Sequence, residues 1–156
     1  MFQVLFVCSG NTCRSPMAQA LLQEKLRLRR LESLVTAASA GVAAWPGQPA
    51  SPEAIAVMNR QGISLAAHRS RSVDAGKLAA ASLVLTMTRS HRENLVQLFP
   101  DLGEKIFTLG DFSATGLDVT DPFGHRLEDY RSCAVQLSQM LDLALEKILR
   151  QAGKTG

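Results

Sequence analysis

Eight consecutive residues near the start of the chain, Cys8–Ser15 (CSGNTCRS), combine a thiol with an arginine six positions later. They follow the short apolar run Phe2–Val7 and are closed by Pro16. The small and polar residues between thiol and arginine let the backbone curve, so that its amides can surround an anion the size of phosphate. The same field lowers the pKa of a thiol, because it favours the charged thiolate. The segment therefore predicts a sulfur nucleophile that attacks phosphorus.

Individual residue types in this segment suit separate parts of that chemistry. Cys8 is the predicted nucleophile, and the planar guanidinium of Arg14 can grip two phosphate oxygens in a way that lysine cannot reproduce. Gly10 permits tight curvature, and Asn11 is the non-glycine residue best suited to a left-handed conformation. The hydroxyl of Ser15 can cap the following helix, and it can also donate to the thiolate.

Phosphoryl transfer also needs an acid that protonates the leaving group, supplied by a loop that can close over the cradle. The sequence Asp121–Gly124 (DPFG), in an irregular stretch before the last helix, offers Asp121 for this role. Pro122 stiffens the loop, and Phe123 offers an aromatic wall to a substrate. An ordinary turn before a helix is the alternative, because Asp-Pro-x-Gly is common there.

The elements that must position these residues alternate along the chain. Strands are predicted for residues 2–7, 34–41, 82–87 and 105–109, and helices for 17–30, 51–62, 75–80, 90–98 and 127–149. Ser15 and Pro16 predict the start of the first helix, and Ser51 with the proline after it predicts the start of the second. Residues 43–51, 68–73 and most of 110–124 are expected to be loops. Such alternation predicts an α/β fold with a parallel sheet and right-handed crossovers.

Length and composition narrow the class of protein. The 156 residues fit one domain, which we place at residues 1–152 with a frayed, disordered tail at 153–156. Apolar residues make up 46% and charged residues 20%, as is ordinary for a globular protein. The net charge of +3 fits either a basic surface that attracts anionic substrates or a few solvated arginines, and no dense basic and aromatic face indicates nucleic-acid binding.

Other features of the sequence bear on the cellular location of the protein and on its partners. No signal peptide opens the chain, no apolar run approaches the roughly 18 residues that span a bilayer, and three cysteines do not form a secreted disulfide framework. We therefore expect a cytoplasmic protein with no membrane or nucleic-acid partner. We also expect a monomer, because no long exposed apolar stripe demands a partner. No cofactor is expected.

The sequence CSGNTCRSP after a short strand, with the later DPF, resembles the low-molecular-weight protein tyrosine phosphatase family. The likeness covers nearly the whole chain, because SAG at Ser39–Gly41, HRSR at His68–Arg71, the LVLTM strand and the final helix follow in the family's order. The resemblance implies a phosphotyrosine protein phosphatase I-like fold: a three-layer sandwich with a four-stranded parallel sheet, in the order 2-1-3-4, flanked by helices. It also implies that no metal is used and that a cysteinyl-phosphate forms.

Site roles carry over from the resemblance by position. Cys8 is implied to be the nucleophile, Arg14 to bind phosphate, and Asp121 to act as the acid and then as the base that activates water. The implied phosphate-binding loop consists of Ser9, Gly10, Asn11, Thr12, Cys13, Arg14 and Ser15. Asn11 and Ser15, with Ser39 and His68, match the family's hydrogen-bond network that holds this loop in shape. Alternatively, Ser39 is a strand residue without a special role, and His68 is an exposed loop histidine.

Three residues bear on which phosphorylated side chain is bound. Thr12 stands where tyrosine-specific members usually carry isoleucine or leucine, and members resembling bacterial protein-arginine phosphatases combine threonine here with DPF. A guanidinium can stack on Phe123 and pair with ionised Asp121, whereas a phosphotyrosine ring gains from apolar and aromatic walls. Trp45 either forms a second wall or anchors its loop. We expect phosphoarginine in proteins as substrate and inorganic phosphate as product, with phosphotyrosine as the alternative.

The remaining cysteines suggest regulation. Cys13 lies five residues after Cys8, so a reversible disulfide can protect the nucleophile from over-oxidation, although a small buried side chain is the alternative. Cys133 is expected in the core. A thiol arsenate reductase would need further cysteines near residues 82–92, where there are none. A zinc-binding or phosphate-sensing module without turnover is a further alternative, but two thiols fall short of the four ligands that zinc prefers.

Overall fold

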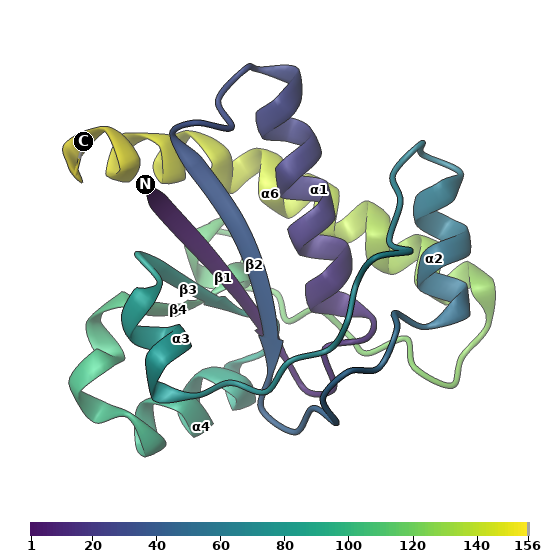
Figure 1. The fold of residues 1–156 in the computed structure, drawn as a ribbon, viewed down its shortest axis with the longest axis horizontal. Helices are drawn as coiled ribbons and strands as arrows, with labels where there is room; N and C mark the ends of the chain where they lie inside the picture. The colour runs from purple at the N-terminus through teal and green to yellow at the C-terminus, as the bar shows by residue number, and fades with distance from the viewer. Residues whose placement is uncertain (156) are drawn as a thin grey trace.

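The computed structural model describes residues 1–155, with side chains through Gly153, and Gly156 lies outside the described residues. Within this range the sheet consists of β1 (Phe2–Cys8), β2 (Val35–Gly41), β3 (Leu83–Thr86) and β4 (Ile106–Thr108). The strands are all parallel and lie in the order β2-β1-β3-β4 (Figure 1). The α/β fold and the strand order predicted from the sequence are confirmed.

Helices cover both faces of this sheet (Figure 1). The described helices are α1 (Arg14–Leu28), α2 (Pro52–Asn59), α3 (Ala75–Ala80), α4 (Arg89–Leu98), α5 (Leu109–Phe112), α6 (Leu127–Thr155) and the 3-10 helix η1 (Pro100–Lys105). Helices α1, α2 and α6 pack together on one face, and α3 and α4 lie on the other. The result is the expected three-layer sandwich.

Strand β1 is the central element, because it pairs with β2 on one side and β3 on the other. Its residues alternate between the two cores: Phe6 packs with the α1 and α6 layer, whereas Leu5 and Val7 pack with α3 and α4. Burial on both faces explains why residues 4–8 are all apolar, whereas the polar Gln3 is only partly buried. Cys8, the last residue of β1, pairs with Gly41 at the carboxyl end of the sheet.

Several local predictions need correction or refinement. Helix α1 begins at Arg14, with Cys13 as the N-cap and no side-chain cap, so Ser15 lies inside the first turn and does not cap the helix. The cap predicted at Ser51 is confirmed, since its side chain accepts a hydrogen bond from the amide of Ala54. Helix α5 and η1 were not predicted. Helix α5 begins at Leu109, the last residue of the strand predicted at 105–109, and continues into the stretch expected to be mostly loop.

The end of the chain also differs from the expectation. Helix α6 continues to Thr155, so the segment 153–156, expected to form a tail, is helical as far as it is described. The treatment of residues 1–152 as one domain stays a prediction. Within residues 1–155, none of the helices has the length and apolar character that crossing a bilayer requires.

Candidate active site

The residues between β1 and α1 form a loop at the carboxyl end of the sheet. Cys8 ends the strand, Arg14 begins the helix, and residues 9–13 join them. Among the described residues, the amides of 9–13 donate to no backbone carbonyl oxygen. Because a helix N-terminus leaves its first amides unpaired and carries a partial positive charge, the loop is a ready anion site.

Asn11 holds the loop in a left-handed turn, with a φ of 57°. Its side-chain oxygen Oδ1 accepts a hydrogen bond from the amide of Arg71 at 2.9 Å, and its Nδ2 donates to Oγ of Ser15 at 2.8 Å. The hydroxyl of Ser15 lies 2.8 Å from Sγ of Cys8. Since Oγ of Ser15 already accepts from Asn11, its own hydrogen is directed at the sulfur.

His68 supports the same turn from outside. Its Nε2 donates to the carbonyl oxygen of Asn11 at 2.7 Å. The hydroxyl of Ser39, by contrast, donates to Oε1 of Gln19 at 2.7 Å and does not reach the loop. Among the described residues, the connection from Ser39 to the loop runs through its carbonyl oxygen, which accepts from the guanidinium of Arg71 at 3.2 Å. The structure thus brings Asn11, Ser15 and His68 together, and Ser39 stands one step removed.

The thiol of Cys8 is subject to opposing influences. Burial raises the pKa of the Cys8 thiol above its ordinary value, while the hydroxyl and amide of Ser15, the charge of Arg14 and the amide of Asn11 lower the pKa. Each opposing influence comes from the loop or from the first turn of α1. Formation of the thiolate therefore depends on these donors, and Ser15 supplies the largest of the lowering effects.

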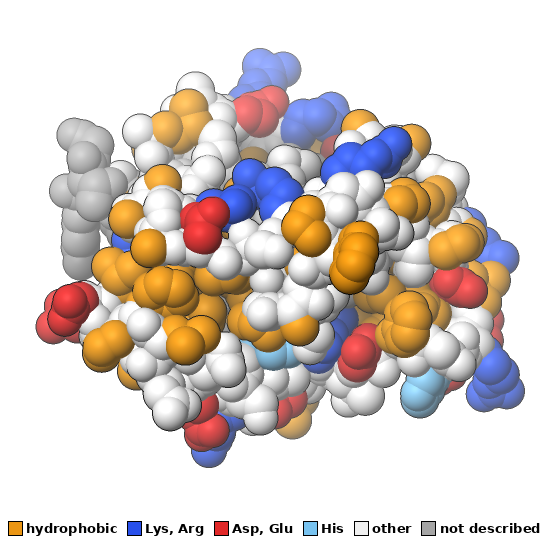
Figure 2. Space-filling view, turned by 60° about the horizontal axis from the view of Figure 1, so that its bottom comes forward, with side chains coloured by type: hydrophobic (Ala, Val, Ile, Leu, Met, Phe, Trp, Pro, Cys, Tyr) orange, Lys and Arg blue, Asp and Glu red, His pale blue; other side chains and the backbone are white. Residues whose placement is uncertain are grey.

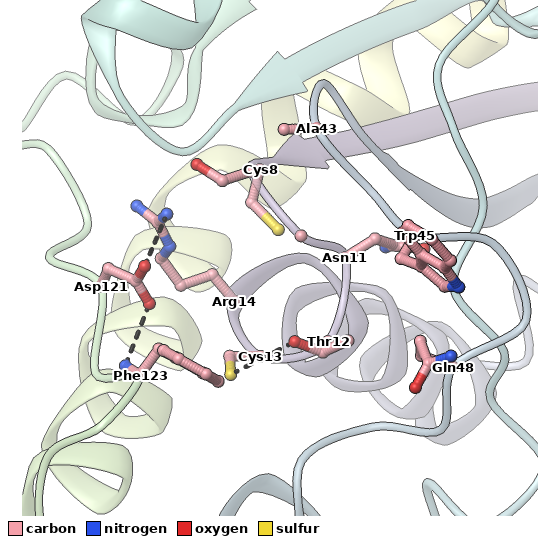
Figure 3. Close-up of a pocket in the computed structure, with 12 residues that line it drawn as sticks. Cys8, Asn11, Thr12, Cys13, Arg14, Ala43, Trp45, Gln48, Asp121 and Phe123 are labelled. Carbon is pink, nitrogen blue, oxygen red and sulfur yellow. Dashed lines mark hydrogen bonds and ion pairs between the residues drawn. The ribbon is translucent and has the colours of Figure 1, made fainter.

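Arg14 connects the loop to the segment that carries Asp121. Its buried guanidinium donates from Nη1 to the carbonyl oxygen of Val119 at 2.9 Å, and Nη2 lies 3.5 Å from Oδ2 of Asp121. Figure 3 shows the guanidinium and the carboxylate facing each other beside the sulfur of Cys8. A charged donor, a carboxyl group and a nucleophilic sulfur thereby line the same cavity.

The segment that carries Asp121 is anchored just before that residue. The amide of Val119 donates to the carbonyl oxygen of Met87, the residue that follows β3. Asp118 accepts a hydrogen bond from the amide of Arg89 at 3.0 Å. Asp121 itself is 48% exposed, and its Oδ1 accepts from the amide of Phe123 at 3.0 Å. The carboxyl group therefore lies on an exposed turn that follows a fixed support.

These groups open into one cavity of about 360 Å³. It is lined by Cys8, Ser9, Gly10, Asn11, Thr12, Cys13, Arg14, Ala43, Trp45, Gln48, Asp121 and Phe123. Asp121 and Phe123 stand on one side, Trp45 and Gln48 on the opposite side, and Thr12 between them (Figure 3). Trp45 and Phe123 are 77% and 67% exposed, so both rings form the rim rather than the core.

The three cysteines are free and buried. Sγ of Cys13 lies within hydrogen-bond distance of Oγ of Ser51, at 3.4 Å, and of the hydroxyl of Tyr130, at 3.7 Å, so it has partners separate from those of Cys8. Burial raises the pKa of Tyr130 and that of Cys133 to about 12 each. The expectation that Cys133 lies in the core is confirmed. The redox pairing of Cys8 with Cys13 stays a prediction.

Sequence reasoning missed two residues of the site. Arg71 donates to Asn11 from its amide and to Ser39 from its side chain. His91, at the start of α4, bonds to the hydroxyl of Ser9. Arg71 ends the HRSR segment, in which only His68 was given a role, and His91 belongs to none of the motifs described above. The packing of the strand ends brings both residues to the loop. The residues that precede α4, 86–88 (TMT), contain no pattern that predicts a role for His91.

The surface around the cavity is mixed in charge. On the face shown in Figure 2, lysine and arginine side chains stand in separate groups, with acidic and apolar side chains between them. The positive potential at the site therefore comes from the buried Arg14 and the loop amides rather than from a basic surface. Of the two interpretations of the net charge, this face fits solvated arginines.

Taken together, the arrangement can hold a tetrahedral oxyanion against a sulfur atom and place a carboxyl group beside it. No group of His, Cys, Asp and Glu side chains among the described residues can hold a metal ion. An anion bound by the loop amides would have the sulfur of Cys8 on its loop side and the carboxyl group of Asp121 on the side of the cavity rim. Phosphoryl transfer to sulfur, with proton transfer by the carboxyl, fits these positions.

Comparison with known proteins agrees with this chemistry. The family of low molecular weight phosphotyrosine protein phosphatases matches residues 3–154. A protein-arginine-phosphatase from Geobacillus stearothermophilus is 43% identical over 148 residues, which cover 94% of this chain and 96% of the relative. The crystal structure of a low molecular weight protein tyrosine phosphatase from T. tengcongensis superposes with a TM-score of 0.90 at 42% identity, covering 94% and 99% of the two chains.

A further solved structure bears on the mechanism of such proteins. It is a mutant of the YwlE arginine phosphatase with a phosphorylated active-site serine, at a TM-score of 0.89 and 34% identity, covering 94% of this chain and 95% of that one. In that protein the phosphoryl group is covalently attached to the active-site residue. Covalent transfer of this kind fits a mechanism that depends on cysteine.

Proposed function

The chain belongs to the low molecular weight phosphotyrosine protein phosphatase family, and we propose that it hydrolyses phosphoarginine in proteins. The proposal assigns Cys8, Arg14 and Asp121 to the reaction and residues 9–15 to phosphate binding. Phosphorylated proteins are then the substrates and inorganic phosphate is a product. We also infer that the protein is cytoplasmic and monomeric, and light scattering of the purified protein can check the monomeric state.

The first step transfers the phosphoryl group to sulfur. The thiolate of Cys8 attacks phosphorus, a sulfur–phosphorus bond forms, and the bond from phosphorus to the leaving nitrogen breaks. Asp121 in its acid form gives its proton to that nitrogen, so the product leaves as a guanidinium. Arg14 and the loop amides hold the phosphoryl oxygens throughout, where charge is greatest in the transition state.

The second step restores the enzyme. Asp121, now a carboxylate, takes a proton from a water molecule, whose oxygen attacks the phosphorus of the cysteinyl-phosphate. The sulfur–phosphorus bond breaks, phosphate is released and Cys8 returns to the thiolate. The hydroxyl of Ser15, 2.8 Å from Sγ, stabilises the sulfur as it leaves. One carboxyl group thus serves as acid and then as base.

The observation that supports arginine is the half-buried Thr12 in the cavity wall between Phe123 and Trp45. A polar side chain there suits a guanidinium or its water, whereas an apolar one suits a phenyl ring. The leaving guanidinium would pair with the carboxylate of Asp121 and stack on Phe123. The relative of 43% identity is an arginine phosphatase, which favours the same substrate.

Phosphotyrosine is the second candidate, and Trp45 is the observation that favours it. Together with Phe123 it supplies aromatic surfaces on opposite sides of the cavity, and each ring contact is worth about 0.5–1.5 kcal/mol beyond area burial. These rings can flank a phenyl group as well as a guanidinium. The choice between the two substrates therefore turns on Thr12.

The decisive experiment compares kcat/KM for phosphoarginine and phosphotyrosine placed in peptides of otherwise identical sequence. We expect the native protein to prefer phosphoarginine, and Thr12→Ile to shift the ratio toward phosphotyrosine by about tenfold, the effect of about 1.4 kcal/mol. Cys8→Ser serves as the inactive control, since it removes the nucleophile. A native preference for phosphotyrosine, or a ratio unchanged by Thr12→Ile, would refute the assignment of arginine.

A further inference from the structure

A hydrogen-bond chain that the mechanism above does not use joins the phosphate loop to helix α4. Oγ of Ser9 lies 2.9 Å from Nε2 of His91, and Nδ1 of His91 lies 3.0 Å from Oγ1 of Thr88. Ser9 is half-buried in the cavity wall, whereas His91 is buried behind it. The chain therefore runs from the N-cap of α4 to the hydroxyl of a residue that lines the cavity.

The direction of each bond follows from the available hydrogens. Oγ1 of Thr88 accepts from the amide of His91 at 3.1 Å, and residues 1–155 offer its own hydrogen no acceptor other than Nδ1 of His91. Nδ1 is then an acceptor, and a neutral imidazole with a bare Nδ1 carries its hydrogen on Nε2. Nε2 donates that hydrogen to Oγ of Ser9. The hydrogen of the Ser9 hydroxyl is left for another acceptor.

His91 stays neutral where the enzyme would work. Burial and the neighbouring positive charge of Arg14 lower the pKa of His91 to about 4, and the carboxylates of Asp118 and Asp121 oppose this less strongly. A protonated ring would carry a hydrogen on Nδ1 as well, which would break the bond from Thr88. Neutrality near pH 7 therefore preserves the bond directions described above.

We propose that the hydroxyl of Ser9 donates a hydrogen bond to a non-bridging oxygen of the bound phosphoryl group, and that His91 is the positioning residue that holds it there. The inference rests on the proposed function, because it requires a phosphoryl group in the cradle. Among the described residues Ser9 Oγ has no side-chain partner other than His91, so a phosphoryl oxygen takes the free hydrogen. Hydrogen bonds to charged oxygens are the stronger class.

The test uses hydrolysis of p-nitrophenyl phosphate and its inhibition by inorganic phosphate. We expect Ser9→Ala and His91→Leu each to lower kcat/KM about tenfold and to weaken inhibition by phosphate to a similar degree, as loss of a hydrogen bond to a charged group does. Ser9→Thr keeps the hydroxyl and His91→Gln keeps a donor near the position of Nε2, so both should retain most of the activity.

A double-mutant cycle separates positioning from a purely structural role. If His91 acts through Ser9, adding His91→Leu to Ser9→Ala should cost no further activity, whereas the two losses would multiply if His91 only stabilised α4. Multiplying losses, or phosphate inhibition unaffected by Ser9→Ala, would overturn the inference. Thermal melting of each variant shows that the protein is folded during the assay.

The same assay distinguishes this inference from the proposed function. An inactive native protein would overturn both, whereas an active native protein with unaffected variants would overturn only the roles of Ser9 and His91. A preference for phosphotyrosine over phosphoarginine would leave the test intact, because the aryl phosphate carries the same phosphoryl group. Success with p-nitrophenyl phosphate therefore supports the inference for either substrate.

Discussion

Replacing Ser15 by alanine tests how the buried sulfur becomes a thiolate. The hydroxyl lies 2.8 Å from Sγ of Cys8 and is oriented by Asn11 Nδ2, also at 2.8 Å. It supplies the largest of the effects that lower the pKa of the Cys8 thiol, against the burial that raises the pKa. In Ser15→Ala the burial remains and this donor is lost, so the pKa must rise.

The size of the effect follows from the bond that is lost. A hydrogen bond to a charged group contributes about 1.5–3 kcal/mol, which corresponds to a ten- to hundredfold fall in the ratio of thiolate to thiol. Below the pKa of the thiol in the native protein, alkylation of Cys8 should slow by about that factor. At pH values above the raised pKa, Ser15→Ala and the native protein should be alkylated at the same rate. The rise of the alkylation rate with pH should therefore occur at higher pH in Ser15→Ala.

Iodoacetamide alkylation measured across pH reports Cys8 separately from the other cysteines when the peptide of residues 1–14, which also contains Cys13, is sequenced by fragmentation in the mass spectrometer. Cys133 should contribute little, because burial raises its pKa to about 12. Ser82→Ala is the matched control, since the Ser82 hydroxyl accepts a bond from the amide of Gln3 at the opposite end of the sheet. If the profiles of Ser15→Ala and the native protein superimpose, Ser15 does not stabilise the thiolate and the reasoning fails.

Two further predictions concern the acid and the second thiol. Asp121→Asn should lower kcat by about 10²–10⁴-fold for aryl phosphates with poor leaving groups and much less for those with good ones, and an equal loss across a leaving-group series would exclude an acid role. Mild peroxide should produce a reversible bond between Cys8 and Cys13, which requires the Cys13 sulfur to leave its partners Ser51 and Tyr130. Mass mapping that finds only over-oxidised Cys8 would contradict it.

The layered fold was predictable because its signals are local and mutually consistent. Strand β1 is buried on both faces from Val4 onward and is apolar there, and Ser51 with Pro52 marks the start of α2 as expected. The four-residue α5 was missed, because an element that short has no apolar period to detect. Its cap, Thr108, also ends β4, so the sequence contains no loop between the two elements.

The site was predictable where its chemistry lies in one segment and was missed where distant segments meet. Cys8 and Arg14 belong to one loop, and their spacing alone indicates an anion cradle. The cap expected at Ser15 was wrong, since the helix begins two residues earlier than predicted, whereas the expected contact of this hydroxyl with the sulfur is present. His91 reaches the loop from α4, and no local pattern predicts a contact between residues 82 positions apart.

The exposed rings at the mouth of the cavity have a consequence for how such proteins diversify. Trp45 and Phe123 belong to neither buried cluster, whereas Cys8 belongs to one of them. Substitutions at an exposed loop usually change folding stability by less than about 0.5 kcal/mol. A new substrate preference can therefore evolve in a few replacements at the mouth, without compensating changes in the interior, while the reaction itself is conserved by the packing beneath.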